Sequence, residues 1–226
     1  MKVNLVGMAL LSVVSLATSA LAGGEGLKDG ATGAAAGWTG FYIGGFAGGA
    51  WGDSSVSTDI GAVTGTSYIT SGPNAAAIEN DGSGSLSDSL FTGGLLVGGT
   101  RQSGQWVYGA ELDFGSFSFN AAGGATNAYP TFPANYTVRT AVETDWLMTA
   151  RGRLGWLASD RLLVYVTGGL ALTDVEVRNS FSDDALSSGV GRGTKSDTKA
   201  GWVIGGGVEL ALHENWTLRG EYLHVD

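Results

Sequence analysis

The sequence predicts an all-β fold: a transmembrane, antiparallel, up-and-down β-barrel of the eight-stranded type, with seven of the strands present in the chain. Three observations lead to this prediction. Apolar residues alternate with small or charged ones at a period of two, which is typical of a strand with two different faces. Short turns alternate with long polar connections, and the tryptophans gather near the ends of the expected strands.

The stretch Gly201–Asp226 shows the alternation most clearly. Trp202, Ile204 and Val208 fall on one parity, and small residues and Glu209 fall on the other. After a polar turn the same pattern restarts. A soluble sheet with one buried face would give the same alternation, so this stretch alone leaves both kinds of fold open.

The composition limits the kinds of structure and function that the sequence can have. Among 226 residues there are 39 glycines, 3 prolines and 15% charged residues, which suits strands and loops rather than helices. There is no cysteine, which excludes a disulfide framework, a thiolate metal site and a cysteine nucleophile. The formal net charge of -9 argues against nucleic acid as a partner.

Residues 1–22 have the features of a secretory signal peptide. Lys2 supplies the positive start, Val3–Leu16 the apolar core and Ala20–Ala22 an A-x-A cleavage site, so we expect cleavage after Ala22. A membrane anchor is the alternative, but the apolar run is short for one. Residues 23–37 follow as a flexible leader rich in glycine and alanine.

The alternation predicts seven strands. They are Trp38–Trp51, Ser89–Arg101, Trp106–Phe117, Val142–Ala158, Leu162–Val177, Thr198–Leu212 and Trp216–Asp226. The connections between them run long, short, long, short, long, short. The short turns are Gln102–Gln105, Ser159–Arg161 and His213–Asn215, and the long polar loops are Gly52–Asp88, Ser118–Ala141 and Arg178–Asp197.

This segregation of connections favours a membrane barrel over a soluble sandwich. Outer-membrane barrels have short turns at one end and long loops at the other, and about 9–11 tilted residues cross the hydrocarbon. The seven tryptophans fall near strand ends, where an interfacial girdle would place them. They are Trp38, Trp51, Trp106, Trp146, Trp156, Trp202 and Trp216.

Five motifs in order give the sequence a family resemblance. They are WTGFYIGG (Trp38–Gly45), TARGRLGW (Thr149–Trp156), YVTGGLA (Tyr165–Ala171), GWVIGGGVE (Gly201–Glu209) and NWTLRGEYLHVD (Asn215–Asp226). The chain resembles the small outer-membrane β-barrel family of alphaproteobacteria, the porin-like immunogenic surface antigens related to opacity proteins. The resemblance implies an eight-stranded barrel in the outer membrane of a Gram-negative cell, inserted by the barrel-assembly machinery. Residues 38–226 would form that domain without its last strand, so we expect the sequence to be a fragment.

Charged residues on the parity opposite the aromatics are expected to face the lumen. They are Glu111, Asp113, Arg151, Arg153, Glu209, Arg219 and Glu221. An eight-stranded barrel is just wide enough for side chains to fill, so we expect these groups to form a structural ion-pair network. A selective pore lined by charge is the alternative.

The sequence predicts no enzyme and no cofactor or metal site. The two histidines, His213 and His224, lie far from any polar cluster that could complete a Ser/His/acid set. The expected partners are outer-membrane lipid, lipopolysaccharide and the assembly machinery. The expected function is an envelope-integrity and surface-antigen role, and the alternative is a narrow porin for small solutes.

Overall fold

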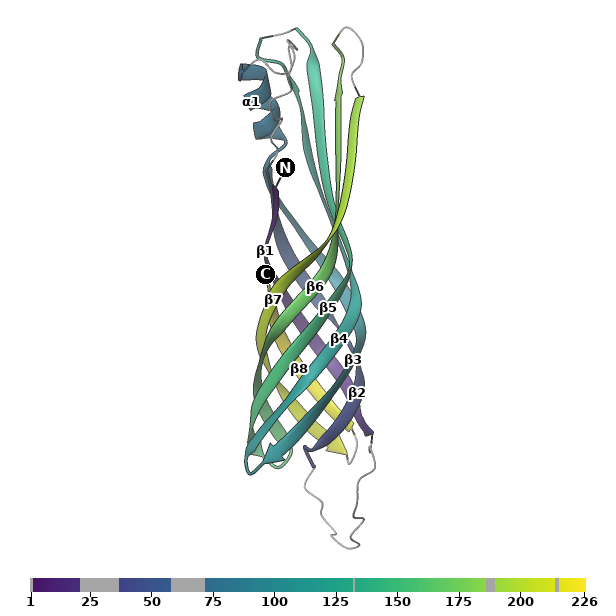
Figure 1. The fold of residues 1–226 in the computed structure, drawn as a ribbon, viewed down its shortest axis with the longest axis vertical. Helices are drawn as coiled ribbons and strands as arrows, with labels where there is room; N and C mark the ends of the chain where they lie inside the picture. Colours follow the sequence, from purple (N-terminus) through teal and green to yellow (C-terminus); the bar gives the residue numbers. More distant parts are fainter. Residues whose placement is uncertain (1, 21–36, 58–71, 132, 186–189, 214–215) are drawn as a thin grey trace, which may run out of the picture.

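A computed structural model describes residues 2–20, 37–57, 72–131, 133–185, 190–213 and 216–226 (Figure 1). The strands follow one another around a closed antiparallel barrel in chain order, β1 to β8. Their bounds are β1 Lys2–Ala20, β2 Gly40–Ser57, β3 Gly84–Ser103, β4 Trp106–Ala128, β5 Asn135–Ser159, β6 Leu162–Asp183, β7 Val190–His213 and β8 Trp216–Val225. The helix α1 spans Gly72–Asp81 in the connection between β2 and β3. Within the described parts of the chain, no helix combines the length and apolar character needed to cross a membrane.

The seven strands expected from the alternation are β2 to β8, and the predicted antiparallel barrel is confirmed. The structure holds one more strand than these seven. β1, formed by the segment assigned to the signal peptide, pairs with β2 on one side and β8 on the other. Seven strands would leave two edges of unpaired backbone groups, and β1 pairs with both edges. The signal-peptide assignment itself stays a prediction, and the predicted leader at 23–37 lies almost entirely outside the described residues.

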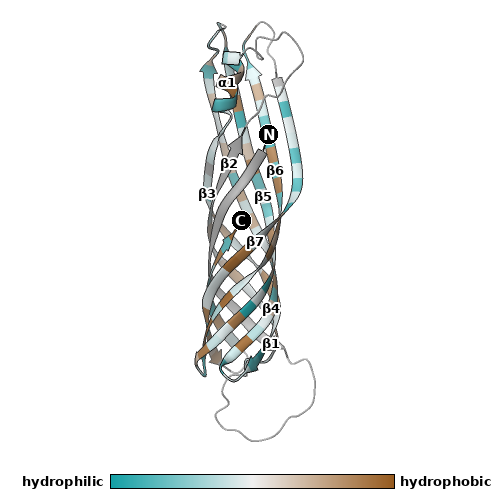
Figure 2. Cartoon of the chain, turned by 60° about the vertical axis from the view of Figure 1, so that its left-hand side comes forward, coloured by the Kyte–Doolittle hydropathy of each residue, from teal (hydrophilic) through white to brown (hydrophobic). Residues whose placement is uncertain are grey.

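Apolar residues recur along the strands in the lower part of the barrel (Figure 2), and many of their side chains are exposed on its outer face. Large apolar side chains of alternating positions are exposed there, such as Phe91, Leu95, Val166 and Leu170 at 62–74%. On β5, ten residues separate the outward positions 146 and 156, both tryptophans. At about 3.4 Å per residue and a tilt of about 40°, this spacing gives a belt of roughly 26 Å, the height expected of a lipid-facing band.

The strands continue well beyond this belt, where the sequence predicted loops. β4 and β5 stay paired up to Ala128 and Asn135, and β6 and β7 up to Ser182 and Val190. Most of the predicted loops at 118–141 and 178–197 is therefore antiparallel ladder, which corrects the loop prediction. We call this part of β4 to β7, with α1, the outer extension (Figure 1).

A β-bulge on β5 separates the belt from the outer extension. The register with β6 shifts by one residue between Glu143 and Leu147. The carboxylate of Asp174 accepts the amide N–H of Asp145 at 3.2 Å and that of Trp146 at 3.4 Å, so the displaced amides are not left unpaired. Because side chains alternate at a period of two, one extra residue exchanges the faces of the strand.

Beyond the bulge the apolar side chains of β5 point inward, together with Thr140 and Thr144. Tyr136, Val138 and Val142 of β5 are buried, whereas Arg139 is exposed. Ile78 of α1 packs against the tyrosine and Val138. The chain thus changes from a lipid-facing barrel to a water-facing β-structure with a partly apolar interior. Its polar outer face explains why its sequence resembles a loop.

Candidate functional site: the interior charge network

The structure brings together inside the barrel all the charged residues that the alternation placed in the lumen. Each of the seven is at most 8% exposed. They come from β4, β5, β7 and β8, whose inward positions lie at similar heights because the strands are in register. The network consists of Glu111, Asp113, Arg151, Arg153, Glu209, Arg219 and Glu221.

Glu111 of β4 lies at the centre of this interior charge network. One carboxylate oxygen lies 2.7 Å from Nη2 of Arg151, and the other lies 2.6 Å from Nη1 of Arg219. Arg153 approaches the second oxygen at 3.7 Å. One carboxylate thus faces three guanidinium groups, an arrangement that is stable only where further acids complete the neutralisation.

Arg151 connects the centre to the two acids on either side of it. Its Nη2 lies 2.9 Å from Asp113, and its Nη1 lies 3.0 Å from Glu221. Thr149 donates a short hydrogen bond to the same oxygen of Asp113. A single guanidinium therefore bridges three acids, Glu111 included, which makes it the most connected cation of the lumen.

Glu209 of β7 forms the remaining acidic corner. Arg153 and Arg219 approach the same oxygen at 2.7 Å and 3.3 Å. The other oxygen accepts a hydrogen bond of 2.8 Å from Thr217. Both oxygens are satisfied, as a buried carboxylate requires.

Two tyrosines complete the network, and the alternation of the sequence predicts neither as a member of the site. Tyr42 donates to Glu111 at 2.7 Å, and Tyr165 donates to Glu221 at 2.9 Å. The Cζ of Arg153 lies 3.9 Å from the centre of the Tyr165 ring, close enough for a cation–π interaction.

The two tyrosines reach their acids in the same way. In each case the tyrosine and the glutamate lie on two strands that flank a third, and a glycine of that middle strand is paired with both. The first set is Tyr42, Gly98 and Glu111, and the second is Tyr165, Gly207 and Glu221. A Cβ at Gly98 would lie 2.4 Å from the Tyr42 ring, and a Cβ at Gly207 would lie 2.7 Å from the Tyr165 hydroxyl. Each ring therefore crosses its glycine. This signal is visible in the sequence only once the strand register is known.

Apolar clusters of buried residues lie on both sides of the charges. Toward the short turns the buried cluster includes Val107, Leu157 and Leu163. Toward the outer extension it includes Phe117 and Phe119, which are 1% and 0% exposed. A cavity of about 30 Å³ lies in the lumen beside Arg151 and Arg219.

Six of the seven tryptophans predicted for the girdle lie on the outer face, and one does not. Trp51, Trp106, Trp156, Trp202 and Trp216 are 44–54% exposed, and Trp146 is half-buried. Trp38 is only 8% exposed and belongs to the apolar layer near the turns, so its assignment to the girdle is wrong. Its indole N–H donates to the carbonyl of Asp160 at 3.3 Å, and the residue fills the barrel end instead of facing lipid.

Comparison with known proteins identifies the family to which the chain belongs. The family model described as "Outer membrane protein beta-barrel domain" matches residues 7–226. The chain belongs to this family. Its apolar belt is accordingly the surface that faces the lipid of the outer membrane.

Relatives of the chain include proteins of Brucella and Rhizobium. The chain is 38% identical over 151 residues to the 31 kDa outer-membrane immunogenic protein of Brucella melitensis biotype 1, a match to 64% of this chain and 58% of that protein. A protein of the same name in Brucella suis biovar 1 matches equally well. The 22 kDa outer membrane protein of Rhizobium leguminosarum bv. viciae is 34% identical over 137 residues, 60% of this chain and 52% of that protein. The chain thus spans little more than half the length of these relatives.

Proposed function

We propose that this protein is a structural barrel with a closed lumen, which supports the integrity of the outer membrane and displays its outer extension as a surface antigen. The observation that carries the proposal is the filling of the lumen by the interior charge network. Its seven charged groups are paired with one another and almost entirely shielded from water. A pore needs a continuous polar path, and apolar layers lie on both sides of the charges here.

Energetics support a permanently closed lumen. To open a path, several of the ion pairs would have to break, and separating one buried pair costs roughly 3–5 kcal/mol. The rings of Phe117 and Phe119 would then have to leave the buried layer next to the network. A role without catalysis or a cofactor agrees with a lumen whose acids and arginines form ion pairs with one another.

Single-channel recording in planar bilayers tests the closed lumen. We expect no conductance, or only rare small openings, from protein that migrates faster on gels before boiling than after it. A double variant, Phe117→Ala with Phe119→Ala, should raise the frequency of openings, whereas Phe114→Ala on the lipid-facing side of β4 should not. A steady conductance in the unmodified protein would instead establish the alternative, a narrow porin for small solutes.

The outer extension supports the antigen role. The Brucella relatives are named as immunogenic proteins, and we extend that property to this chain. β4 to β7 carry exposed polar side chains far beyond the apolar belt, where antibodies can reach them. Antibodies raised against residues 118–141 should label intact cells.

We also propose the barrel-assembly machinery as a partner during insertion, since a closed barrel needs all of its strands paired in lipid.

A further inference from the structure

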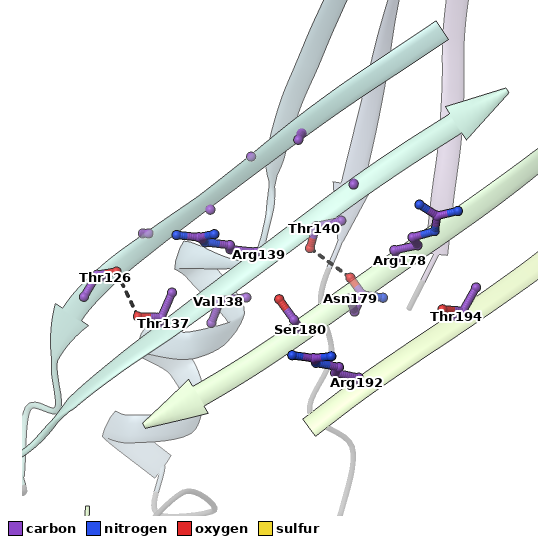
Figure 3. A pocket seen from close by; sticks show the side chains of 15 residues that line it. Thr126, Thr137, Val138, Arg139, Thr140, Arg178, Asn179, Ser180, Arg192 and Thr194 are labelled. Carbon is purple, nitrogen blue, oxygen red and sulfur yellow. Dashed lines mark hydrogen bonds between the residues drawn. The ribbon is translucent and has the colours of Figure 1, made fainter. Parts of the chain in front are cut away.

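The outward face of the outer extension carries a group of arginines on an otherwise acidic protein. The chain has 12 basic and 21 acidic residues. Three of its arginines are used inside the lumen. Arg139, Arg178 and Arg192 lie on one face of three neighbouring strands, around a hollow of about 730 Å³ (Figure 3).

The strand register explains how the arginines come together. Arg139 of β5 is paired with Ser180 of β6, and Ser180 is paired with Arg192 of β7. Directly opposed residues of neighbouring strands share a face, so the three side chains form one row. With strands about 4.8 Å apart, the backbones of the two arginines are separated by roughly 10 Å, and both guanidinium groups can reach a group lying over the serine.

The floor of the hollow is made of small residues. Gly124 of β4 is paired with Arg139, and a Cβ at this glycine would lie 3.1 Å from the arginine Cγ. Ala122 and Ala141 lie in the next row toward the membrane. The hydroxyl groups of Ser180 and Thr194 also line the hollow and add hydrogen-bond donors beside the guanidinium groups.

Arg178 differs from the other two arginines because its guanidinium group forms ion pairs with two glutamates. Its Nε lies 2.7 Å from Glu176 and its Nη1 lies 2.9 Å from Glu143. Its charge is thereby compensated on the membrane side of the row. Arg139 and Arg192 are exposed and present most of the available positive charge.

The position of the row relative to the lipid identifies the kind of ligand. Arg139 lies seven residues beyond Trp146, which marks the outer border of the apolar belt. At about 3.4 Å per residue and a tilt of about 40°, this places the row roughly 18 Å above that border. The core saccharide of lipopolysaccharide occupies this level of the outer leaflet, and its phosphate and carboxylate groups match guanidinium forks.

We infer that Arg139 and Arg192, with Ser180 between them, bind the anionic core saccharide of lipopolysaccharide on the outer face of the barrel. This inference rests on the proposed role as a surface barrel and gives that barrel a specific contact with its own membrane. The contact is polar and directional, and it adds to the nonspecific burial of the apolar belt in lipid.

Binding of fluorescently labelled, rough-type lipopolysaccharide to the folded protein in detergent micelles tests the inference. The double variant Arg139→Gln with Arg192→Gln should bind about tenfold more weakly or worse, because it loses two charge-assisted contacts. The matched control is Lys195→Gln with Lys199→Gln, which removes the same charge from the alternate face of β7 and should leave the affinity unchanged. The affinity of the unmodified protein should also fall as salt is raised.

Two comparisons decide what is recognised. Lipopolysaccharide stripped of its phosphate groups should bind more weakly to the unmodified protein, and the double variant should not distinguish the two forms. Displacement of the labelled glycolipid by inorganic phosphate at equal concentration would overturn the glycolipid as the ligand and leave free phosphate in its place. Equal binding by the double variant would overturn the site, while an unchanged gel shift on boiling would show that the proposed barrel is intact.

Discussion

At the scale of single residues, Arg151 is the side chain on which the interior charge network depends most. It contacts Glu111, Asp113 and Glu221 at 2.7–3.0 Å and is 4% exposed. A buried charge is tolerated because its partners neutralise it, and the partners are tolerated for the same reason. The loss of this one cation therefore leaves three acids undercompensated.

We expect Arg151→Ala to lower the free energy of unfolding of the barrel by roughly 3–5 kcal/mol, the usual cost of breaking a buried ion pair. The temperature at which the unboiled, fast-migrating form disappears from gels measures the effect. Arg101→Ala is the matched control, since this arginine is exposed near a hairpin turn and should change that temperature little. An unchanged transition in Arg151→Ala would contradict a structural role for the network.

The alternation of the sequence predicted the seven charges of the network but neither of its tyrosines. A charged residue on the inward parity can be recognised from the sequence because a lone charge facing lipid is costly. Tyr42 and Tyr165 belong to the site through glycines on neighbouring strands, Gly98 and Gly207. That relation depends on strand register, which no local sequence pattern specifies.

At the scale of elements, α1 is held against β4 and β5 by polar contacts. The hydroxyl of Tyr136 in β5 donates to the carboxylate of Asp81, the last residue of α1, at 2.5 Å. Asn127 of β4 donates to the same oxygen at 2.7 Å. At the other end of the helix, Asn74 accepts hydrogen bonds from the amide and the hydroxyl of Thr131.

The contact between Tyr136 and Asp81 should make the docking of α1 sensitive to alkali. Burial, together with the hydrogen bond and charge of Asp81, raises the pKa of Tyr136 to about 12 from its ordinary value of 10.0. A raised pKa means that the folded form holds the proton more tightly than the unfolded form does. This stabilisation is complete below pH 10 and is lost as the pH rises through 12.

A probe on α1 can follow this loss. The chain has no cysteine, so Ala76→Cys introduces a unique site for an environment-sensitive dye at an exposed position of the helix. Its signal should change between pH 10 and pH 12, while the barrel strands stay folded by circular dichroism. In Tyr136→Phe that step should vanish, because the titrating hydroxyl is gone; a step that persists in this variant would assign the transition to another group.

The extension also shows why part of the fold could not be predicted. Strands were recognised where an apolar face meets lipid, because there the alternation is strong. Beyond the bulge at Glu143–Leu147 the apolar residues turn inward and the outward ones are polar, as in Thr137, Arg139 and Glu143. Such a strand resembles a polar loop in sequence, and the bulge that exchanges its faces leaves no local mark apart from Asp174, whose carboxylate accepts the two displaced amides.

At the scale of the whole molecule, the segment that follows Met1 lies between β2 and β8 in the structure. β1 pairs with β2 from Lys2 to Ala20 and with β8 from Met8 to Thr18. The same segment has the charge, the apolar core and the A-x-A site of a signal peptide. These two roles exclude each other in the mature protein, because cleavage after Ala22 would remove β1.

We expect export to remove this segment, so that protein extracted from the outer membrane begins at Gly23. Intact-mass measurement of the unboiled, fast-migrating species gives its first residue directly. In the variant Ala22→Arg the cleavage site is destroyed, and the precursor mass should accumulate outside the outer membrane.

With β1 removed, the backbone edges of β2 and β8 would need another partner, since unpaired groups in lipid cost several kcal/mol each. A mature species that keeps residues 2–20, and in which cysteines placed at Ser12 and Gly48 become cross-linked, would instead establish β1 as a permanent strand of the barrel.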